Sequence, residues 1–411
     1  MNKIIEYLPK MKTSEELINS LKVLPDYSEN ICDEDSVTRL VALSDLYKIY
    51  IPSFMSVEIY SKLYLSLIRS LNKKQTKLAT IQQNENFKAV LNQEYRGIIG
   101  GSDSFTIIGN SGIGKSSAIS RAIELITENK VIETEAPYSK IIPCVTVQCP
   151  FDSSVKGLLL EILRKVDEHL ESSYYEKALR SRATTDMLIG SVSQVALNHI
   201  GLLIVDEIQN VVNSKNGKSL VGALTQLINN SGISICMVGT PESNIFFEQA
   251  MQLARRSLGL QYGAMKYDDT FREFCKILFS YRYVKYESNL TEGIISWLYE
   301  HSGGITSVVV SLIHDAQELA ILNGAEKLDI DNLTEAYKKR LSLLHSYIEP
   351  QKPLRTIFKG GKGMNEKKDK NASERLKTLN LMQGILSESK SSQKDILTLV
   401  KEKINVEEIR I

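Results

Sequence analysis

The sequence predicts an α/β fold in which helices cover both faces of a parallel sheet and a smaller helical domain follows. Two observations support this. Strand-length apolar segments alternate with helical segments between residues 105 and 238, and after about residue 276 the pattern becomes helical only. A chain of 411 residues is long enough for one large core with a smaller domain attached.

The predicted strands are short runs of apolar residues, as expected for parallel strands buried on both faces. They occupy residues 105–108, 141–147, 202–205 and 233–238. Helical segments separate them at residues 115–128, 154–171, 186–199 and 217–230. This alternation is typical of strand–helix–strand units in one sheet.

The segment before the first strand is predicted to be helical. Residues 1–45 are polar with short helical patterns at 14–24 and 35–46, and a stronger helix is expected with Ser56 as its N-cap. Its apolar stripe is Ile59, Leu63, Leu67 and Leu71. The basic residues that follow are interpreted as a solvated helix end: Arg69, Lys73, Lys74 and Lys77.

The C-terminal part divides into a helical domain and a basic tail. Helices are expected at residues 291–301, 306–322 and 329–344. Residues 351–377 carry nine Lys or Arg and three acidic residues, which indicates a flexible basic linker. A short amphipathic helix at about residues 376–386 and a last helix at about 392–404 are expected after it. The predicted division is an N-terminal extension (1–45), an α/β core (46–280), a helical lid (281–350) and a tail (351–411).

Composition excludes several classes of protein. The hydrophobic fraction of 43% and charged fraction of 24% are those of an ordinary globular protein, which excludes disorder of the whole chain. No apolar run approaches the roughly 18 residues of a membrane span, and no signal peptide is expected. The five cysteines are scattered without a CxxC motif, as expected for core residues in a reducing cytosol. A net charge of +1 means that any nucleic-acid binding depends on a local basic surface or on many copies side by side.

Residues 109–116, GNSGIGKS, match the phosphate-loop pattern GxxxxGK[ST]. The motif follows a predicted strand and opens a predicted helix, so its backbone N–H groups and the helix dipole favour a bound phosphate. Lys115 is expected to reach the β- and γ-phosphates of ATP, and Ser116 to offer its hydroxyl to Mg²⁺. The nucleotide-binding residues are predicted to be Gly109, Asn110, Ser111, Gly112, Ile113, Gly114, Lys115, Ser116 and Ser117.

Two carboxylates end the third predicted strand. Asp206 is expected to complete the Mg²⁺ site with Ser116, and Glu207 to orient and polarise the attacking water. A solvated strand end is the alternative, but the phosphate loop upstream favours the catalytic interpretation.

The phosphate loop and the acid pair resemble those of AAA+ ATPases. Two further positions have residue types that are expected in that class of protein. Thr240, at the end of the fourth strand, is interpreted as a sensor of the γ-phosphate, although Gly-Thr-Pro is also a good turn. Arg256, or alternatively Arg255, is interpreted as an arginine finger that reaches the ATP of a neighbouring subunit. An ordinary surface arginine pair is the competing explanation.

With these residues placed, the sequence resembles the TnsC/TniB family of AAA+ transposition regulators. The resemblance spans about residues 45–350 and rests on LIVDEIQN (203–210), IP (51–52) with VEIY (57–60), CP (149–150) with KGL (156–158), HSGGIT (301–306) and AQ (316–317). The chain departs from many AAA+ proteins because no arginine occurs between residues 303 and 322, so a lid-borne arginine sensor is not expected.

The resemblance implies an ATPase, using ATP and Mg²⁺, that assembles as a ring or helical filament on double-stranded DNA. It would connect a target selector of the TniQ/TnsD type to a transposase in the cytoplasm of a bacterium, without a membrane partner. Candidate DNA contacts are Lys156, Arg180, Arg182, Thr184 and Thr185. The tail (351–411) is expected to recruit the transposase, and residues 1–45 to face the target selector.

Two other functions fit the nucleotide motifs. An initiator or clamp-loader ATPase of replication would be expected to carry a winged-helix DNA reader after the lid, and the last 60 residues look too short for one. A signalling scaffold switched by nucleotide would be expected to carry long repeats, and none occur in the sequence. The sequence identifies neither the transposase nor the target selector, nor whether an RNA guides the selection.

Overall fold

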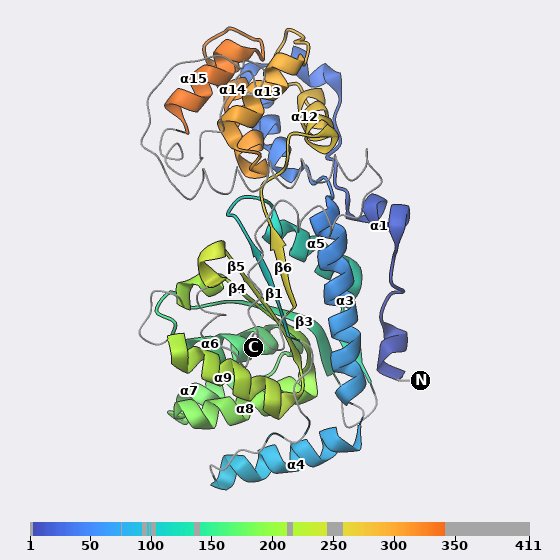
Figure 1. Cartoon of the computed structure of the whole chain (residues 1–411), viewed down its shortest axis with the longest axis vertical. Coiled ribbons are helices and arrows are strands. Elements are labelled where there is room, and N and C mark those ends of the chain that lie inside the picture. Colours follow the sequence, from blue (N-terminus) through green and yellow to red (C-terminus); the bar gives the residue numbers. More distant parts are fainter. Residues whose placement is uncertain are drawn as a thin grey trace, which may run out of the picture. The chain divides into compact units, whose positions relative to one another are not determined.

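The structure is a computed structural model, and it describes residues 3–74, 76–92, 97, 99, 104–134, 140–211, 217–244 and 258–341. By contacts within the chain, residues 1–352 form one compact unit, to which all described residues belong (Figure 1). The predicted tail helices and residues 342–344 of the third lid helix lie outside the described residues.

The sheet has six strands in the order β2–β3–β4–β5–β1–β6. The strands are β1 (Phe105–Gly109), β2 (Ile132–Glu133), β3 (Lys140–Gln148), β4 (Ile200–Asp206), β5 (Ser234–Gly239) and β6 (Leu258–Tyr262). All pairings are parallel except that of the short edge strand β2 with β3. The prediction of a parallel α/β sheet is therefore confirmed, while β2 and β6 were missed.

Helices cover both faces of this sheet (Figure 1). The helices α3 (Phe54–Lys74) and α5 (Lys115–Thr127) pack on one face. The helices α6 (Val155–Leu170), α8 (Thr185–His199) and α9 (Gly217–Ser231) pack on the other. The short helix α7 (Tyr174–Arg180) follows α6, and α4 (Lys77–Asn92) packs against α8.

The structure corrects the predicted start of α3. The helix begins at Phe54, so Ser56 lies within its first turn and is not the N-cap. The Ser56 hydroxyl accepts the backbone N–H of Ser53 at 3.0 Å, a contact that satisfies one of the donors left free at a helix start.

Lys74 is also corrected, because it is buried and not part of a solvated helix end. Only 2% of its surface is exposed, and its ammonium donates to the carbonyls of Ala196, at 2.7 Å, and Leu197 at the end of α8. Burial lowers the pKa of Lys74 to about 7. The lysine thus satisfies carbonyls that the helix end leaves without an internal partner.

The lid consists of α12 (Asp269–Ser280), α13 (Glu292–Ser302), α14 (Thr306–Leu322) and α15 (Ile330–Lys339). Helix α2 (Ser36–Ala42) and the 3₁₀ turn η3 (Leu43–Lys48) join it, and the buried Arg39 forms a two-pronged ion pair with Glu326 at 2.6 Å. Further upstream, η1 (Lys3–Tyr7) and α1 (Ser14–Leu21) pack on the α3 side of the sheet. The N-terminal 45 residues therefore contact both the sheet layer and the lid, and their partner-binding role stays a prediction.

Within the described residues, no single helix has the length and apolar character of a membrane span. The pair α13 and α14 passes that test only when the two are taken together, and they are bent by 120°.

We expect Lys74→Met to change how stability depends on pH. Between the folded pKa of about 7 and the ordinary lysine pKa of 10.5, the unfolded chain binds the Lys74 proton and the folded chain does not. In that window the contribution of Lys74 to folding stability rises with pH, by up to about 1.4 kcal/mol per pH unit. Urea unfolding at pH 6 to 9 gives the free energy of unfolding of the wild type and of Lys74→Met. The wild-type value minus the variant value should rise with pH above about 7 and should not change with pH below about 6.5. The control is Lys88→Met, at an exposed lysine. If the difference in unfolding free energy between wild type and Lys74→Met did not depend on pH, the lowered pKa of Lys74 would be wrong.

Candidate nucleotide-binding site

The loop between β1 and α5 has the backbone geometry of a phosphate loop. Gly112 and Gly114 have φ values of +79° and +91°, a region that residues with a side chain rarely adopt. Helix α5 starts at Lys115, directly after Gly114, so the positive end of its dipole lies at the loop. The segment can therefore direct backbone N–H groups and a helix N-terminus at the same anion.

Lys115 lies inside this loop. Its ammonium donates to the carbonyls of Gly109, at 2.6 Å, and Asn110, at 2.9 Å, and the residue is 8% exposed. Burial lowers its pKa, and the carboxylates of Asp206 and Glu207 oppose that shift. Both of these partners are neutral carbonyl oxygens, so the buried cation suits the negative charge of a polyphosphate.

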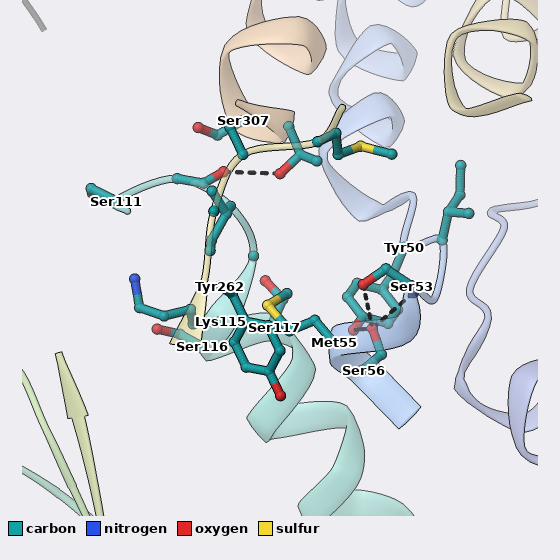
Figure 2. Close-up of a pocket in the computed structure, with 18 of the residues that line it drawn as sticks. Tyr50, Ser53, Met55, Ser56, Ser111, Lys115, Ser116, Ser117, Tyr262 and Ser307 are labelled. Atoms are coloured by element: carbon teal, nitrogen blue, oxygen red, sulfur yellow. Dashed lines mark hydrogen bonds between the residues drawn. The ribbon is translucent and has the colours of Figure 1, made fainter. Parts of the chain in front are cut away.

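The loop opens into a pocket of about 970 Å³. Its walls come from the phosphate loop, the carboxyl ends of β4, β5 and β6, residues 46–56 and the start of α14. Figure 2 shows Lys115 and Ser116 on one side of this space and Tyr50, Ser53 and Ser56 on the other, with Tyr262 and Ser117 between them. The volume is at the upper end of the range of small-molecule sites and is large enough for a nucleotide.

Ser116 and Asp206 fit a magnesium ion. The Ser116 hydroxyl lies 3.3 Å from Oδ2 of Asp206, although the two residues are far apart in the chain. Adjacent oxygen ligands of an octahedral Mg²⁺ lie about 3.0 Å apart, as follows from metal–oxygen distances of about 2.1 Å. These two residues could hold the ion with little movement.

Glu207 follows β4 and is exposed at the pocket. Its backbone N–H donates to Oδ1 of Asp206 at 2.8 Å, and its carboxylate accepts a hydrogen bond from the side-chain amide of Gln209. The Oε1 atom of Gln209 in turn accepts the backbone N–H of Thr240 at 3.3 Å. The Thr240 hydroxyl donates to Glu242 and lowers the pKa of that carboxyl.

Gln209 is therefore a site residue to which the sequence analysis assigned no role. It was visible there as part of LIVDEIQN, three positions after Asp206, but its partner Thr240 is 31 residues further on.

The lid contacts the phosphate loop directly, and it does so without an arginine. The Thr306 hydroxyl and the Ser307 backbone N–H both donate to the carbonyl of Gly112, at 2.9 and 3.0 Å. A Cβ atom on Gly112 would lie 2.3 Å from the Ser307 hydroxyl oxygen, so the loop glycine is also needed for this close approach. The start of α14 therefore contacts the phosphate loop through the hydroxyl of Thr306 and the backbone of Ser307.

The pocket lining also contains a half-buried polar pair, Tyr262 and Glu58. The Tyr262 hydroxyl, at the end of β6, donates to Glu58 of α3 at 2.7 Å, and burial raises the pKa of Tyr262. This bond joins the unpredicted strand β6 to the helix that starts beside the pocket.

The remaining predicted residues are the arginine-finger candidates and the candidate DNA contacts. Arg255 and Arg256 lie outside the described residues. The five candidate DNA contacts are exposed, and Lys156 on α6 donates to the carbonyl of Ala183, at 3.2 Å, which connects it to the segment of the other four. Arg180 pairs with Glu176 at 3.0 Å, and the Thr184 hydroxyl caps α8. Their role in DNA binding stays a prediction.

Part of the chain matches a known protein family. Residues 61–260 match the family described as "Bacterial TniB protein". No curated protein matches the chain in sequence at a significant level. The resemblance to the TnsC/TniB family is confirmed over the matched residues.

Several solved structures are similar in fold. They include the ORC2 protein of Aeropyrum pernix in its ADP form (17% identity, TM-score 0.40, 64% of this chain and 67% of that chain) and the ORC1 protein of the same organism in complex with DNA (12%, 0.42, 63% and 64%). The Cdc6p protein of Pyrobaculum aerophilum is also similar (12%, 0.41, 63% and 66%). The chain spans about two thirds of the length of these proteins. The phosphate loop, the order of the parallel strands and the helical lid agree with the predicted AAA+ fold.

We expect Lys115→Ala to weaken ATP binding by roughly 100-fold, because it removes charge-assisted hydrogen bonds worth roughly 1.5–3 kcal/mol. Titration with a fluorescent ATP analogue in the presence of Mg²⁺ measures the affinity. Lys130→Ala, at an exposed lysine just beyond α5, is the matched control. Unchanged affinity in Lys115→Ala would contradict the phosphate-loop assignment.

Proposed function

Taking the TniB match of residues 61–260 as the premise, we propose that this chain is an ATPase of DNA transposition. It assembles with ATP as a ring or filament on double-stranded DNA and links a target selector of the TniQ/TnsD type to the transposase. The observation that carries the proposal is that the matched residues contain the phosphate loop, the acid pair and Thr240 around one pocket. The proposed location is the cytoplasm of a bacterium.

The pocket supports in-line hydrolysis of ATP. The N–H groups of residues 109–116 and the Lys115 ammonium hold the β- and γ-phosphates. Magnesium, held by Ser116 and Asp206, would supply neutralising charge at those phosphates. Glu207 orients the attacking water and accepts its proton, and the Thr240 hydroxyl contacts the γ-phosphate.

Two features of the proposal concern neighbouring subunits and DNA. Arg256, with Arg255 as the alternative, completes the site of the next subunit with a permanent charge. Lys156, Arg180 and Arg182 bind DNA phosphates, and the hydroxyls of Thr184 and Thr185 add uncharged contacts. Mixed assemblies of Arg256→Ala and Lys115→Ala subunits test the first feature, because the pattern of lost hydrolysis depends on which neighbour supplies the arginine.

The chain ends supply the proposed links to other proteins. Residues 351–411 recruit the transposase through a tether with an excess of basic charge, and residues 1–45 face the target selector. The supporting observation for the tail is its composition of nine basic and three acidic residues over 351–377. A pull-down of transposase by full-length and truncated assemblies at equal DNA occupancy tests the tail, and equal recovery would remove it from the mechanism.

We expect Glu207→Gln to separate binding from hydrolysis. The substitution keeps the shape but removes the carboxylate that accepts the proton, so kcat should fall by about 100-fold while ATP-dependent binding to DNA persists. ATP turnover and co-sedimentation with duplex DNA measure the two properties, with Glu124→Gln on the exposed face of α5 as control. Turnover at the wild-type rate would show that Glu207 is not the water-orienting residue, and a wild type that never sediments with DNA would refute the proposed assembly.

We expect the triple variant Lys156→Ala, Arg180→Ala and Arg182→Ala to bind DNA more weakly and with less dependence on salt. Each phosphate contact adds about 0.9 to the slope of log affinity against log salt, so the slope should fall by about 2 to 3. Fluorescence anisotropy with duplexes of unrelated sequence measures it in the presence of ATP. The exposed Lys276→Ala on the lid is the control, and an unchanged slope in the triple variant would place the DNA surface elsewhere.

A further inference from the structure

The segment that follows the acid pair contains a polar side chain that the mechanism above does not use. This segment is the 3₁₀ turn η4 (Ile208–Val211), and Gln209 is half-buried within it. We propose that Gln209 is a positioning residue. It holds the hydrolytic carboxylate of Glu207 at a fixed position relative to Thr240, at the end of β5. The inference rests on the proposed ATPase function and adds a residue to its site.

The two ends of the Gln209 carboxamide have different partners. The NH₂ group donates to Oε2 of Glu207, and the carbonyl oxygen accepts the backbone N–H of Thr240 at 3.3 Å. A carboxamide offers a donor and an acceptor on adjacent atoms, which neither a carboxylate nor an ammonium does. Gln209 is thus chemically suited to connect an acid to a backbone N–H.

The position of Gln209 is set from both sides. On the β5 side, a Cβ atom on Gly239 would lie 3.1 Å from Oε1 of Gln209 and 2.7 Å from Cγ2 of Ile208, so the glycine allows the turn to approach the strand end. On the other side, the Asn210 amide donates to the carbonyl of Cys149 at 3.0 Å, and the Ser153 hydroxyl donates to the carbonyl of Asn210 at 2.9 Å. The backbone beneath Gln209 is therefore anchored, and its side chain has a defined direction.

Glu207 itself has less support. It is exposed, its φ of +58° is unusual for a residue with a side chain, and among the described residues the Gln209 amide is the side-chain partner of its carboxylate. Without that amide the carboxylate would sample several rotamers. Misplacing a catalytic group by about 1 Å can cost up to about 100-fold in rate, so one positioning bond has a measurable effect on turnover.

The arrangement also links two events in the site. Thr240 is the proposed γ-phosphate contact, and its backbone N–H is bonded to the side chain that holds Glu207. A displacement of the β5 end by the γ-phosphate would therefore reach the carboxylate through one side chain. Loss of Gln209 should reduce kcat much more than ATP affinity, because Gln209 lines the pocket but is hydrogen-bonded to Glu207 and Thr240 and not to the phosphate loop.

The first experiment compares Gln209→Met with the wild-type full chain. Methionine preserves length and apolar volume but removes both hydrogen bonds. Steady-state hydrolysis should show kcat reduced roughly tenfold, with KM and the affinity for a fluorescent ATP analogue within about twofold of wild type. Gln83→Met is the matched control, because Gln83 is a half-buried glutamine on α4 whose amide donates to Asn198 at 3.3 Å, away from the pocket.

The second experiment asks whether Gln209 acts through Glu207. Single-turnover hydrolysis is measured for Glu207→Gln with and without Gln209→Met. If Gln209 positions that carboxylate, the second substitution should change the rate by less than about twofold, since the group it positions is already absent. A full tenfold loss in the Glu207→Gln background would overturn the inference, as would an unchanged kcat in Gln209→Met alone.

The outcomes distinguish the inference from the function on which it rests. A wild type that does not hydrolyse ATP with Mg²⁺ and DNA refutes the proposed function. A wild type that hydrolyses ATP together with a Gln209→Met variant of equal kcat refutes the inference alone. If Gln209→Met lowered ATP affinity and thermal stability along with kcat, Gln209 would have a general structural role. That outcome would also overturn the inference.

Discussion

The parallel pairing of β5 with both β4 and β1 is the constraint on which the site depends. Parallel strands end at the same edge of a sheet, so three segments that are distant in the chain meet there. The phosphate loop follows β1, the acid pair ends β4, and Thr240 follows β5. No local interaction could bring these three together, and a shift of register at either pairing would separate them.

Charge and burial then determine what this edge can bind. Lys115 is largely buried and lies near Asp206 and Glu207, whose charges oppose the effect of burial on its pKa. The carbonyl oxygens that hold its ammonium are neutral, so the positive charge is available to an anion. A polyphosphate with magnesium would complement both signs, because the acids could hold the metal while the lysine and the loop N–H groups could hold the phosphates.

The lid and the N-terminal residues connect this edge to the rest of the chain. The start of α14 bonds to Gly112, so the helical domain contacts the loop that would hold the phosphates. The lid is in turn held by Arg39, which bonds to Glu326 and to the carbonyl of Tyr283. The helical domain is therefore joined by polar contacts both to the phosphate loop, through Thr306 and Ser307, and to α2, through Arg39.

The sequence by itself determined the features that depend on neighbouring residues. The four longer predicted strands, the phosphate loop and the Asp206–Glu207 pair follow from apolar runs and short motifs, and the structure contains them at the predicted places. The family resemblance followed from the same motifs with their flanking residues. Tertiary structure decided the rest. Strand β6 contains glycine and glutamine and is defined by its pairing with β1. Lys74 resembles a solvated lysine in the sequence and is buried only because its ammonium meets the carbonyls at the end of α8. The bond between Gln209 and Thr240 depends on the close approach of η4 to β5 that Gly239 permits. Such contacts join residues far apart in the chain, and their energy depends on the burial and direction of side chains, which only the packed fold sets.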